Sequence, residues 1–426
     1  MHAKKRVTDV FGVSNVILPD SYVDRGDLDS EIGDLLHDPN HVALRGVSKS
    51  GKSWLRQRLI PDAIVIQCRL GKTIVDIYRE ALGELGMKLQ ISEVRQSTLV
   101  GSVEASAEVG IKLMAKVQAK LGLSRTVSNS ATTQALAQDI NDLRFVANLL
   151  LESGRRLVVE DFHYLSVEER KHFAFDLKAL WDYGVFVVVV GIWSDRNLLM
   201  NLNPDLSGRI REASIVWSDA ESRQIFTQGG KSLNLEFSDA IKTHAVTDCY
   251  GNCGILQRLI SDTLRRLQMT EACEVLTSVD DEPALEHAEM FYAEELNSIY
   301  QTFAARVSSG IRTRQNATGI YAHAMAAALG APDRDLIQGV PLDRIFTAAH
   351  ARESRIQKGN LRIALGRIEA MQVDADGRGL VLAYSDGHVM VVDRQLLLYR
   401  KYSTVRWPWE DLIQDAEETG ESFTAD

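Results

Sequence analysis

The first half of the chain alternates between short apolar runs and longer segments in which apolar residues recur every three or four positions. Five runs predict strands: HVALRG (41–46), DAIVIQCRL (62–70), RRLVVED (155–161), VFVVVVGIW (185–193) and ASIVW (213–217). A run without polar interruption, such as VFVVVVGIW, is typical of a strand buried on both faces of a parallel sheet. Helical segments between the strands indicate βαβ units, so the predicted fold class is α/β with a parallel five-stranded sheet.

The helical segments of this half have recognisable ends. TIVDIYREALGELGM (73–87) shows a helical period, and QALAQDINDLRFVANLLLESG (134–154) is a helix closed by Gly154. Ser166 and Glu169 open SVEERKHFAFDLKALWDYG (166–184) as a capping box. The stretch 90–130 is rich in Ser, Ala, Thr and Val with a weak pattern, and we interpret it as an insertion that forms a helix or a hairpin.

After Trp217 the pattern predicts helices without further strands up to about residue 295. Three helices follow, NATGIYAHAMAAALG (316–330), PLDRIFTAAHARES (341–354) and NLRIALGRIEAMQV (360–373). The segment GLVLAYSDGHVMVVD (379–393) predicts two strands around the turn Asp386-Gly387. Three helices and a hairpin predict a winged helix-turn-helix. The acidic end is expected to be frayed.

These patterns divide the 426 residues into several parts, more than one ordinary hydrophobic core would hold. The predicted parts are an N-terminal lead (1–36), an α/β core (37–218, with the insertion at 90–130), a helical lid (219–300), a winged-helix domain (301–402) and an acidic tail (403–426).

Composition and charge are those of a globular protein of the cytoplasm. The apolar content is 45%, and no apolar run reaches the roughly 18 residues of a membrane helix. The four cysteines do not make a disulfide framework, and Cys249 and Cys253 lack a second pair of zinc ligands at a sensible spacing. The net charge is −10, yet residues 311–402 carry 13 Lys+Arg against 9 Asp+Glu, a balance of +4 that permits nucleic-acid contact there.

One segment carries a phosphate-binding motif. RGVSKSGKSWL (45–55) fits G-x-x-x-x-G-K-[ST] through Gly46, Gly51, Lys52 and Ser53, with a predicted strand before it and a helix after it. Lys52 would reach the β- and γ-phosphates of ATP, and Ser53 would ligate Mg²⁺. The backbone N–H groups would cradle the anion, so the loop contacts are expected from Ser48, Lys49, Ser50 and Trp54 as well.

A pair of acids ends the third predicted strand. Glu160 and Asp161 follow Leu157-Val158-Val159. One carboxylate would hold Mg²⁺ and the other would polarise the attacking water. We assign the metal to Glu160 and the base to Asp161, with a helix-capping acid as the alternative for Asp161.

Two further positions complete the candidate site. Arg209 precedes the fifth strand, where a guanidinium can reach the γ-phosphate of a neighbouring subunit, and Arg211 lies nearby. Ser194 follows the fourth strand, where a polar group could orient water. A solvated surface arginine is the alternative for Arg209.

Phosphate loop, paired acids, arginine, lid and winged helix together resemble the AAA+/STAND ATPases, in particular the branch of the replication initiators and their bacterial relatives linked to transposition and phage defence. SYVDRGDLDSEIGDLL (21–36) resembles the element upstream of the phosphate loop in that branch. The resemblance implies that Tyr22 and Val23 lie against adenine with Arg25 nearby, and that ATP binds between core and lid.

This chain departs from the family pattern twice. The family writes Asp-Glu at the second acidic site, where this chain has Glu160-Asp161, so either acid is a candidate for the base and slow turnover is expected. Initiators carry an arginine in the lid beside a Gly-Asn pair, where this chain has Gly254. Arg258, one turn later, is the substitute.

Two functions remain open at this level. The first is an ATPase whose nucleotide state controls homo-oligomer assembly and DNA engagement, with Lys358, Arg362, Arg367 and His388 of the winged helix as DNA contacts. The second is an ATP-bound signalling switch with little turnover, whose winged helix docks a separately encoded effector protein. The resemblance sets both in anti-phage defence or mobile-element biology.

Overall fold

The computed structural model describes residues 4–95, 98–120, 139–193, 196–310, 318–372 and 380–419. Ser194, part of the predicted insertion and the last seven residues of the acidic tail lie outside these ranges. The chain forms two compact units. The α/β unit comprises Arg25–Gly46 and Lys52–Ile215, and the helical unit comprises Met1–Asp24, Val47–Gly51 and Val216–Asp426.

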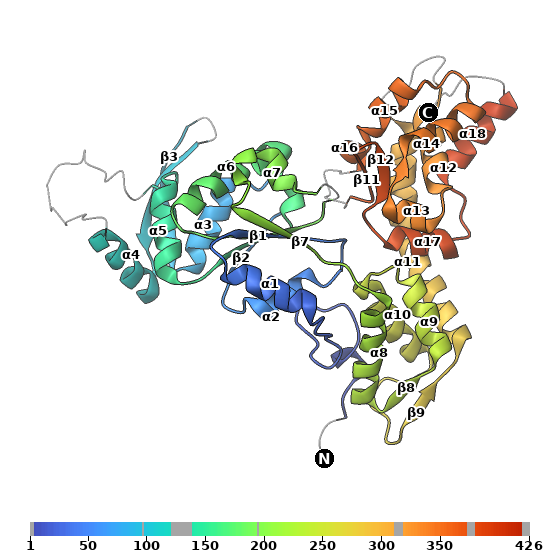
Figure 1. Ribbon diagram of the computed structural model, residues 1–426, viewed down its shortest axis with the longest axis horizontal. Coiled ribbons are helices and arrows are strands. Elements are labelled where there is room, and N and C mark those ends of the chain that lie inside the picture. Colours follow the sequence, from blue (N-terminus) through green and yellow to red (C-terminus); the bar gives the residue numbers. More distant parts are fainter. Residues whose placement is uncertain are drawn as a thin grey trace. The chain divides into compact units, whose positions relative to one another are not determined.

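The α/β unit is built on a parallel sheet of five strands (Figure 1). The strands are β1 (His41–Arg45), β2 (Ile64–Gln67), β5 (Leu157–Glu160), β6 (Val188–Gly191) and β7 (Ile210–Ser214). Their order is β2-β5-β6-β1-β7, and β1 pairs with both β6 and β7. The predicted α/β class and the five predicted strands are confirmed, although β7 (Ile210–Ser214) begins three residues before the range predicted for the fifth strand, 213–217. The strand that carries the phosphate motif lies inside the sheet, and β7 forms one edge.

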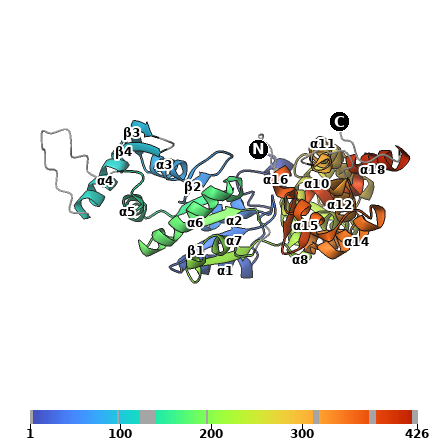
Figure 2. The same cartoon turned by 90° about the horizontal axis from the view of Figure 1, so that it is seen from above.

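Helices cover both faces of this sheet, as Figures 1 and 2 show. Helices α1 (Asp27–His37) and α2 (Lys52–Leu59) pack on one face with Val42 and Leu44 of β1. Helices α3 (Ile74–Glu84), α5 (Leu143–Ser153) and α6 (Val167–Asp182) pack on the other face, with Ala43 of β1. Successive side chains of a strand point to opposite faces, so burial on both sides explains the uninterrupted apolar runs.

A buried histidine fixes the start of β1. His41 Nδ1 accepts the Val187 N–H at 2.9 Å, so its Nε2 carries the proton and donates to the Leu177 carbonyl at 2.8 Å. Burial lowers the pKa of His41 to about 4, which keeps the ring neutral near pH 7. The ring thereby links β1 to the entry of β6 and to α6.

The predicted insertion contains both of the expected elements. Strands β3 (Met87–Arg95) and β4 (Thr98–Ala105) form an antiparallel hairpin, and α4 (Glu108–Lys120) follows it and packs on α5. Helix α5 ends at Gly154 as predicted, but it begins only at Leu143, after the N-cap Asp142. Ser166 caps α6, whereas the Glu169 carboxylate accepts the Ile74 N–H at 2.8 Å and so connects α6 to α3.

The first part of the helical unit contains α8 (Asp219–Leu233), α9 (Asp239–Asp248), α10 (Cys253–Arg266) and the long α11 (Glu282–Ser309). The prediction that strands stop after Trp217 is wrong, because β8 (Leu235–Phe237) and β9 (Thr277–Val279) pair in parallel. Each strand has only three residues, too few for a two-residue period to stand out from the surrounding helical pattern.

The second part of the unit follows α11. It contains α12 (Ile320–Leu329), α13 (Asp333–Gln338), α14 (Leu342–Arg352), α15 (Lys358–Leu365) and α16 (Ile368–Gln372), with the three-stranded sheet β10 (Val340–Pro341), β12 (His388–Val391) and β11 (Leu382–Ser385). The hairpin at Asp386-Gly387 is confirmed, and both residues have positive φ. The single helix predicted over 360–373 is wrong, because the chain breaks at Gly366 between α15 and α16.

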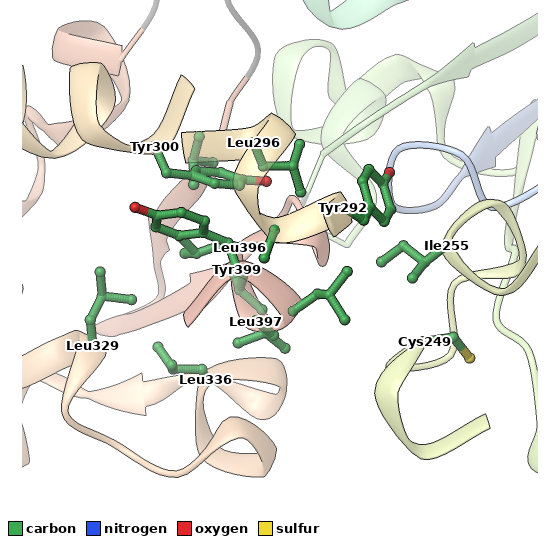
Figure 3. Packing of buried hydrophobic residues seen from close by; sticks show 14 of the residues in the cluster. Cys249, Ile255, Tyr292, Leu296, Tyr300, Leu329, Leu336, Leu396, Leu397 and Tyr399 are labelled. Carbon is green, nitrogen blue, oxygen red and sulfur yellow. The ribbon is translucent and has the colours of Figure 1, made fainter. Parts of the chain in front are cut away.

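Two helices end the described chain, α17 (Gln395–Tyr402) and α18 (Pro408–Thr419). The expectation of a frayed tail is wrong for α18, because Trp409 is buried. Helix α17 packs on α11, where the rings of Tyr300 and Tyr399 lie 5.1 Å apart (Figure 3). Helix α11 therefore belongs to both parts, through α10 at one end and α17 at the other.

The remaining short elements are α7 (Leu198–Leu202) and the 3₁₀ turns η1 (Val7–Asp9), η3 (Phe162–Tyr164) and η4 (Pro204–Leu206). Among the helices of the described residues, none is long and apolar enough to cross a membrane.

Candidate functional site

The phosphate motif forms a loop between β1 and α2, as predicted. Helix α2 begins at Lys52, directly after Gly51. Lys49 has φ 59° and Gly51 has φ 87°, so the chain turns twice through the left-handed region. At Gly51 this conformation favours glycine over any other residue. The N-terminal turn of α2 thus follows a curled, glycine-dependent backbone, the geometry that gathers N–H groups around an anion.

Lys52 is buried at the start of α2. Its Nζ donates to the Gly46 carbonyl at 3.0 Å, which holds the ammonium beside the loop backbone. Ser53 is exposed and Trp54 half-buried in the same turn. A buried ammonium at the head of a helix gives this end of the unit a local positive charge.

The two predicted acids lie at the carboxyl end of β5 but in different surroundings. Glu160 is buried, and its Oε1 lies 2.9 Å from Arg56 Nε. Asp161 has φ 56°, so its side chain leaves the strand in another direction. Burial raises the pKa of the Asp161 carboxyl, the neighbouring Glu160 adds to the rise, and the charge of Lys52 opposes it. Glu160 is thus an ion-paired carboxylate, whereas the charge of Lys52 acts on Asp161.

Two residues beside these acids, Arg56 and His163, were not predicted from the sequence. Arg56 stands one helical turn after Lys52, and that spacing was the available signal for its partnership with Glu160. His163 Nδ1 accepts the Ile192 N–H at 3.3 Å, just beyond the end of β6. Burial, chiefly, lowers the pKa of His163 to about 4, so a neutral imidazole connects the ends of β5 and β6.

The predicted arginine of the fifth strand is engaged within its own unit. The Arg209 guanidinium lies 4.9 Å above the Trp181 ring and donates to the Asp205 carbonyl. Arg211, two residues later, is exposed on β7, the edge strand of the sheet. Of these two arginines, Arg211 has the more accessible side chain.

The middle of the phosphate loop packs within the helical unit. Asn252 Nδ2 donates to the Ser48 carbonyl at 2.7 Å, and Trp217 Nε1 donates to the Ser50 carbonyl at 2.9 Å. The Gly254 N–H donates to the Lys49 carbonyl at 3.0 Å. Three backbone carbonyls of the loop are therefore held by the start of α10 and the segment before α8.

Gly254 explains one departure from the family pattern. A Cβ atom at this position would lie 2.5 Å from the Lys49 Cβ and 2.9 Å from the Lys49 carbonyl oxygen. No side chain fits there without moving the loop. The arginine of the initiators is therefore sterically excluded at Gly254 in this arrangement.

A chain of polar side chains continues from the loop to α17. Lys49 Nζ donates to Gln395 Oε1 at 2.6 Å and lies 3.5 Å from the Tyr292 hydroxyl. Gln395 Nε2 donates to Asp393 Oδ1 at 3.0 Å, and Tyr300 donates to Asp393 Oδ2 at 2.9 Å. We name these five residues the loop network. It connects the phosphate loop to α11 and to the N-terminus of α17.

The other residues predicted to lie near the nucleotide have different surroundings. Arg258 pairs with Asp262 and with Glu295, at 2.9 Å for the latter, and lies over the Tyr292 ring. Val23 is buried in the apolar core of the helical unit, with Tyr22 half-buried beside it in sequence.

Arg25 belongs to the α/β unit, where its Nε lies 3.3 Å from Asp29 Oδ1 and both side chains are buried. The resemblance alone assigns Tyr22, Val23 and Arg25 to adenine, and that assignment stays a prediction.

The four predicted DNA contacts differ in availability. Arg362 and Arg367 are exposed, on α15 and just after it, and His388 is exposed at the hairpin. Lys358 forms an ion pair with Asp343 of α14. The exposed Ile363 lies next to Arg362. Arg362, Arg367 and His388 are thus each exposed, while Lys358 is already paired.

Comparisons with known proteins found no matching family model and no matching curated protein. Solved structures do match. A Walker-type ATPase of Pyrococcus abyssi is 17% identical with a TM-score of 0.49, over 90% of this chain and 96% of that one. A STAND protein with a tetratricopeptide repeat sensor from Pyrococcus horikoshii is 10% identical with a TM-score of 0.37, over 95% of this chain and 45% of that one.

The AMPPCP-bound DnaA of Aquifex aeolicus is 14% identical with a TM-score of 0.35, over 82% of this chain and 90% of that one. The first two are named as a Walker-type ATPase and a STAND protein, classes to which the predicted AAA+/STAND resemblance refers. The features of this chain that carry it are its strand order, the loop after β1 and the acids after β5.

The unequal surroundings of the two acids predict separable effects. Glu160→Gln should lower the thermal midpoint, because losing one partner of a buried ion pair typically costs about 3–5 kcal/mol, and should weaken Mg²⁺-dependent ATP binding. Asp161→Asn should retain ATP and lose turnover. Differential scanning fluorimetry, calorimetry with ATP and phosphate release measure the three quantities.

The exposed Glu168→Gln on α6 is the matched control and should behave like the parent. Parent-like hydrolysis by both Glu160→Gln and Asp161→Asn would show that the second acidic site is misplaced.

Proposed function

We propose that this chain is an intracellular ATPase that binds MgATP at the phosphate loop and uses its nucleotide state to control homo-oligomer assembly and DNA engagement. The observation that carries the proposal is the loop itself: a curled backbone between β1 and α2 that ends on the buried Lys52, with Asp161 in its electrostatic reach. Lys52 would offset the charge of the β- and γ-phosphates. Ser53 is the Mg²⁺ ligand in this proposal.

The acids divide the remaining work. Asp161 accepts a proton from the attacking water in this proposal, and its raised pKa suits a base better than that of an ordinary surface carboxylate. Glu160 would act on Mg²⁺ through water, since its Oε1 is already paired with Arg56. MgATP supplies the electrophilic phosphoryl group when it is bound.

The loop network supports coupling between nucleotide and the C-terminal part of the chain. An anion entering the loop competes with Gln395 for the Lys49 ammonium. Release of that hydrogen bond would leave Gln395, the first residue of α17, held by Tyr292 and Asp393, and α17 packs on α11. This gives nucleotide binding a direct physical route to α17 within the helical unit.

DNA engagement in this proposal uses the surface of α15 and the hairpin. Arg362, Arg367 and His388 are exposed there, and guanidinium groups bind phosphates and guanine edges well. Between α11 and α17 the described chain has five helices, α12 to α16, and a small antiparallel sheet, so the winged helix that the sequence predicts stays a prediction. A protein effector at the same surface is the alternative.

A second function is favoured by one observation. Arg56 occupies an oxygen of Glu160, and a carboxylate held by an arginine is less free to act on metal or water. This suits a signalling switch that binds ATP with little turnover and docks an effector. Phosphate release by the parent separates the two proposals.

Lys52→Ala should weaken ATP binding at least tenfold, because a hydrogen bond from a charged group contributes about 1.5–3 kcal/mol. Calorimetry measures the affinity, and the exposed Lys112→Ala on α4 serves as the control. ATP affinity and turnover unchanged from the parent would eliminate the phosphate-loop assignment.

If a neighbour supplies the arginine, specific activity should rise with protein concentration. Arg209→Ala is expected to lower turnover sharply while keeping ATP affinity, since an arginine in trans is worth about 10³–10⁵ in rate. Mixing it with Lys52→Ala should restore part of the activity. Arg211→Ala is tested in parallel, because Arg211 is the exposed one of the pair.

Concentration-independent activity without restoration in any mixture would contradict a shared site and favour the switch. If only the mixture of Arg211→Ala with Lys52→Ala regains ATP turnover, the arginine supplied to the neighbour is Arg211 and not Arg209.

The loop network predicts non-additive effects. Lys49→Met and Gln395→Leu should each change ATP affinity by about three- to tenfold, and the double variant should be no worse than the stronger single one. The coupling free energy should fall in the range of roughly 0.5–3 kcal/mol that is typical of contacting residues. The exposed Gln357→Leu is the control. Strict additivity would show that the network does not link the loop to α17.

A further inference from the structure

A group of polar side chains in the helical unit lies apart from the phosphate loop and has no role in the proposed ATPase. His244 and Asp248 stand four residues apart on α9, and Glu289 faces them from α11. One ligand atom of each lies within 4.8 Å of the other two. The group therefore presents one imidazole and two carboxylates to a common point.

The carboxylates of this group are removed from solvent. The Glu289 side chain is 0% exposed and that of Asp248 2%, whereas His244 retains 19%. A carboxylate buried this completely needs a compensating partner, because transfer of an isolated charge from water costs several kcal/mol or more.

Asp248 has its partners. Lys401 Nζ donates to its two oxygens at 2.7 and 2.6 Å, and Tyr402 donates to Oδ2 at 2.6 Å. Both residues come from the end of α17. These contacts orient Asp248, and Oδ1, which accepts only from Lys401, keeps a further lone pair for another ligand.

Glu289 is different. Neither of its carboxylate oxygens makes a hydrogen bond. The carboxyl group points toward the imidazole of His244, whose Nε2 is 3.3 Å from Oε2. A buried carboxylate without a hydrogen bond calls for an explanation, and a bound ion is one.

The spacing of the atoms fits a small tetrahedral ion. Bonds of 2.0–2.2 Å to a tetrahedral zinc ion place two ligand atoms roughly 3.3–3.6 Å apart. His244 Nε2 lies 3.3 Å from Glu289 Oε2 and 3.6 Å from Asp248 Oδ2. Since Asp248 Oδ2 already accepts two hydrogen bonds, closing the ligand set requires this carboxylate to turn Oδ1 toward the ion.

The outer groups agree with this arrangement. His244 Nδ1, the ring nitrogen away from the cluster centre, lies 3.9 Å from Glu282 Oε2. Histidine ligands commonly direct their second nitrogen to a carboxylate, which fixes the ring orientation. Cys249, although adjacent to Asp248, is not a ligand here, because its thiol donates to the Val246 carbonyl.

We propose that His244, Asp248 and Glu289 form a structural binding site for a divalent transition metal ion of the zinc class. One nitrogen and two carboxylate oxygens suit Zn²⁺ better than Mg²⁺, which prefers an all-oxygen octahedron. The ion supplies the positive charge that Glu289 lacks and joins α9 to α11. Through Lys401 and Tyr402 the end of α17 forms the outer shell.

The test is calorimetric titration of Zn²⁺ into the full chain, stripped with chelator and free of nucleotide. One Zn²⁺ per chain should bind, and His244→Ala and Glu289→Gln should each weaken the affinity at least tenfold. His287→Ala and Glu294→Gln, two exposed positions on α11, are the matched controls and should bind like the parent. Zn²⁺ should raise the thermal midpoint of the parent and of both controls only.

X-ray absorption at the zinc edge keeps the proposal testable on the parent alone, in case a variant fails to fold. A first shell of nitrogen and oxygen with one imidazole supports it. Absence of Zn²⁺ binding, equal binding by the His244 and Glu289 variants, or sulfur in the first shell would overturn it.

Discussion

Burial of the parallel sheet on both faces is the constraint on which the α/β unit depends. The middle strands have almost no solvent-facing positions, so polar side chains can stand only where strands end. Lys52, Asp161 and His163 all lie beyond the carboxyl ends of β1 and β5. The apolar interior of the sheet and the polar residues at its carboxyl end therefore have the same cause. The phosphate loop follows directly from the carboxyl end of β1, which lies between β6 and β7.

The charged groups at the carboxyl end of the sheet are arranged in pairs. Arg56 and Glu160 neutralise each other at 2.9 Å, and the Lys52 ammonium is held by the Gly46 carbonyl. Asp161 is left with a raised pKa. Partly buried charges of opposite sign interact strongly when little water lies between them, so changing any one of these groups alters the others. The two acids therefore differ in their surroundings as well as in their order along the chain. Glu160 pairs with Arg56, whereas Asp161 is influenced by the charge of Lys52.

In the helical unit, α11 has a comparable organising position. Its buried tyrosines reach the loop network and the aromatic packing on α17, and Glu289 faces α9 from the same helix. Two polar clusters, one around Asp393 and one around Asp248, therefore lie along a single helix and both involve α17. Buried polar groups have few satisfactory arrangements, so such clusters fix the register of the helices that share them.

The sequence by itself determined the five strands, the phosphate loop, the acids after β5 and the hairpin at Asp386-Gly387. Each of these depends on local patterns: apolar runs, glycines at fixed spacing, and a turn that requires positive φ. The three-residue strands β8 and β9 and the break at Gly366 fell below what a local pattern can indicate. Only the tertiary structure decided the partnerships, namely Arg56 with Glu160, Lys49 with Gln395, Gly254 against the loop, and His244 with Glu289. These residues are up to 346 positions apart in the chain, and their contacts follow from how helices pack rather than from any periodicity.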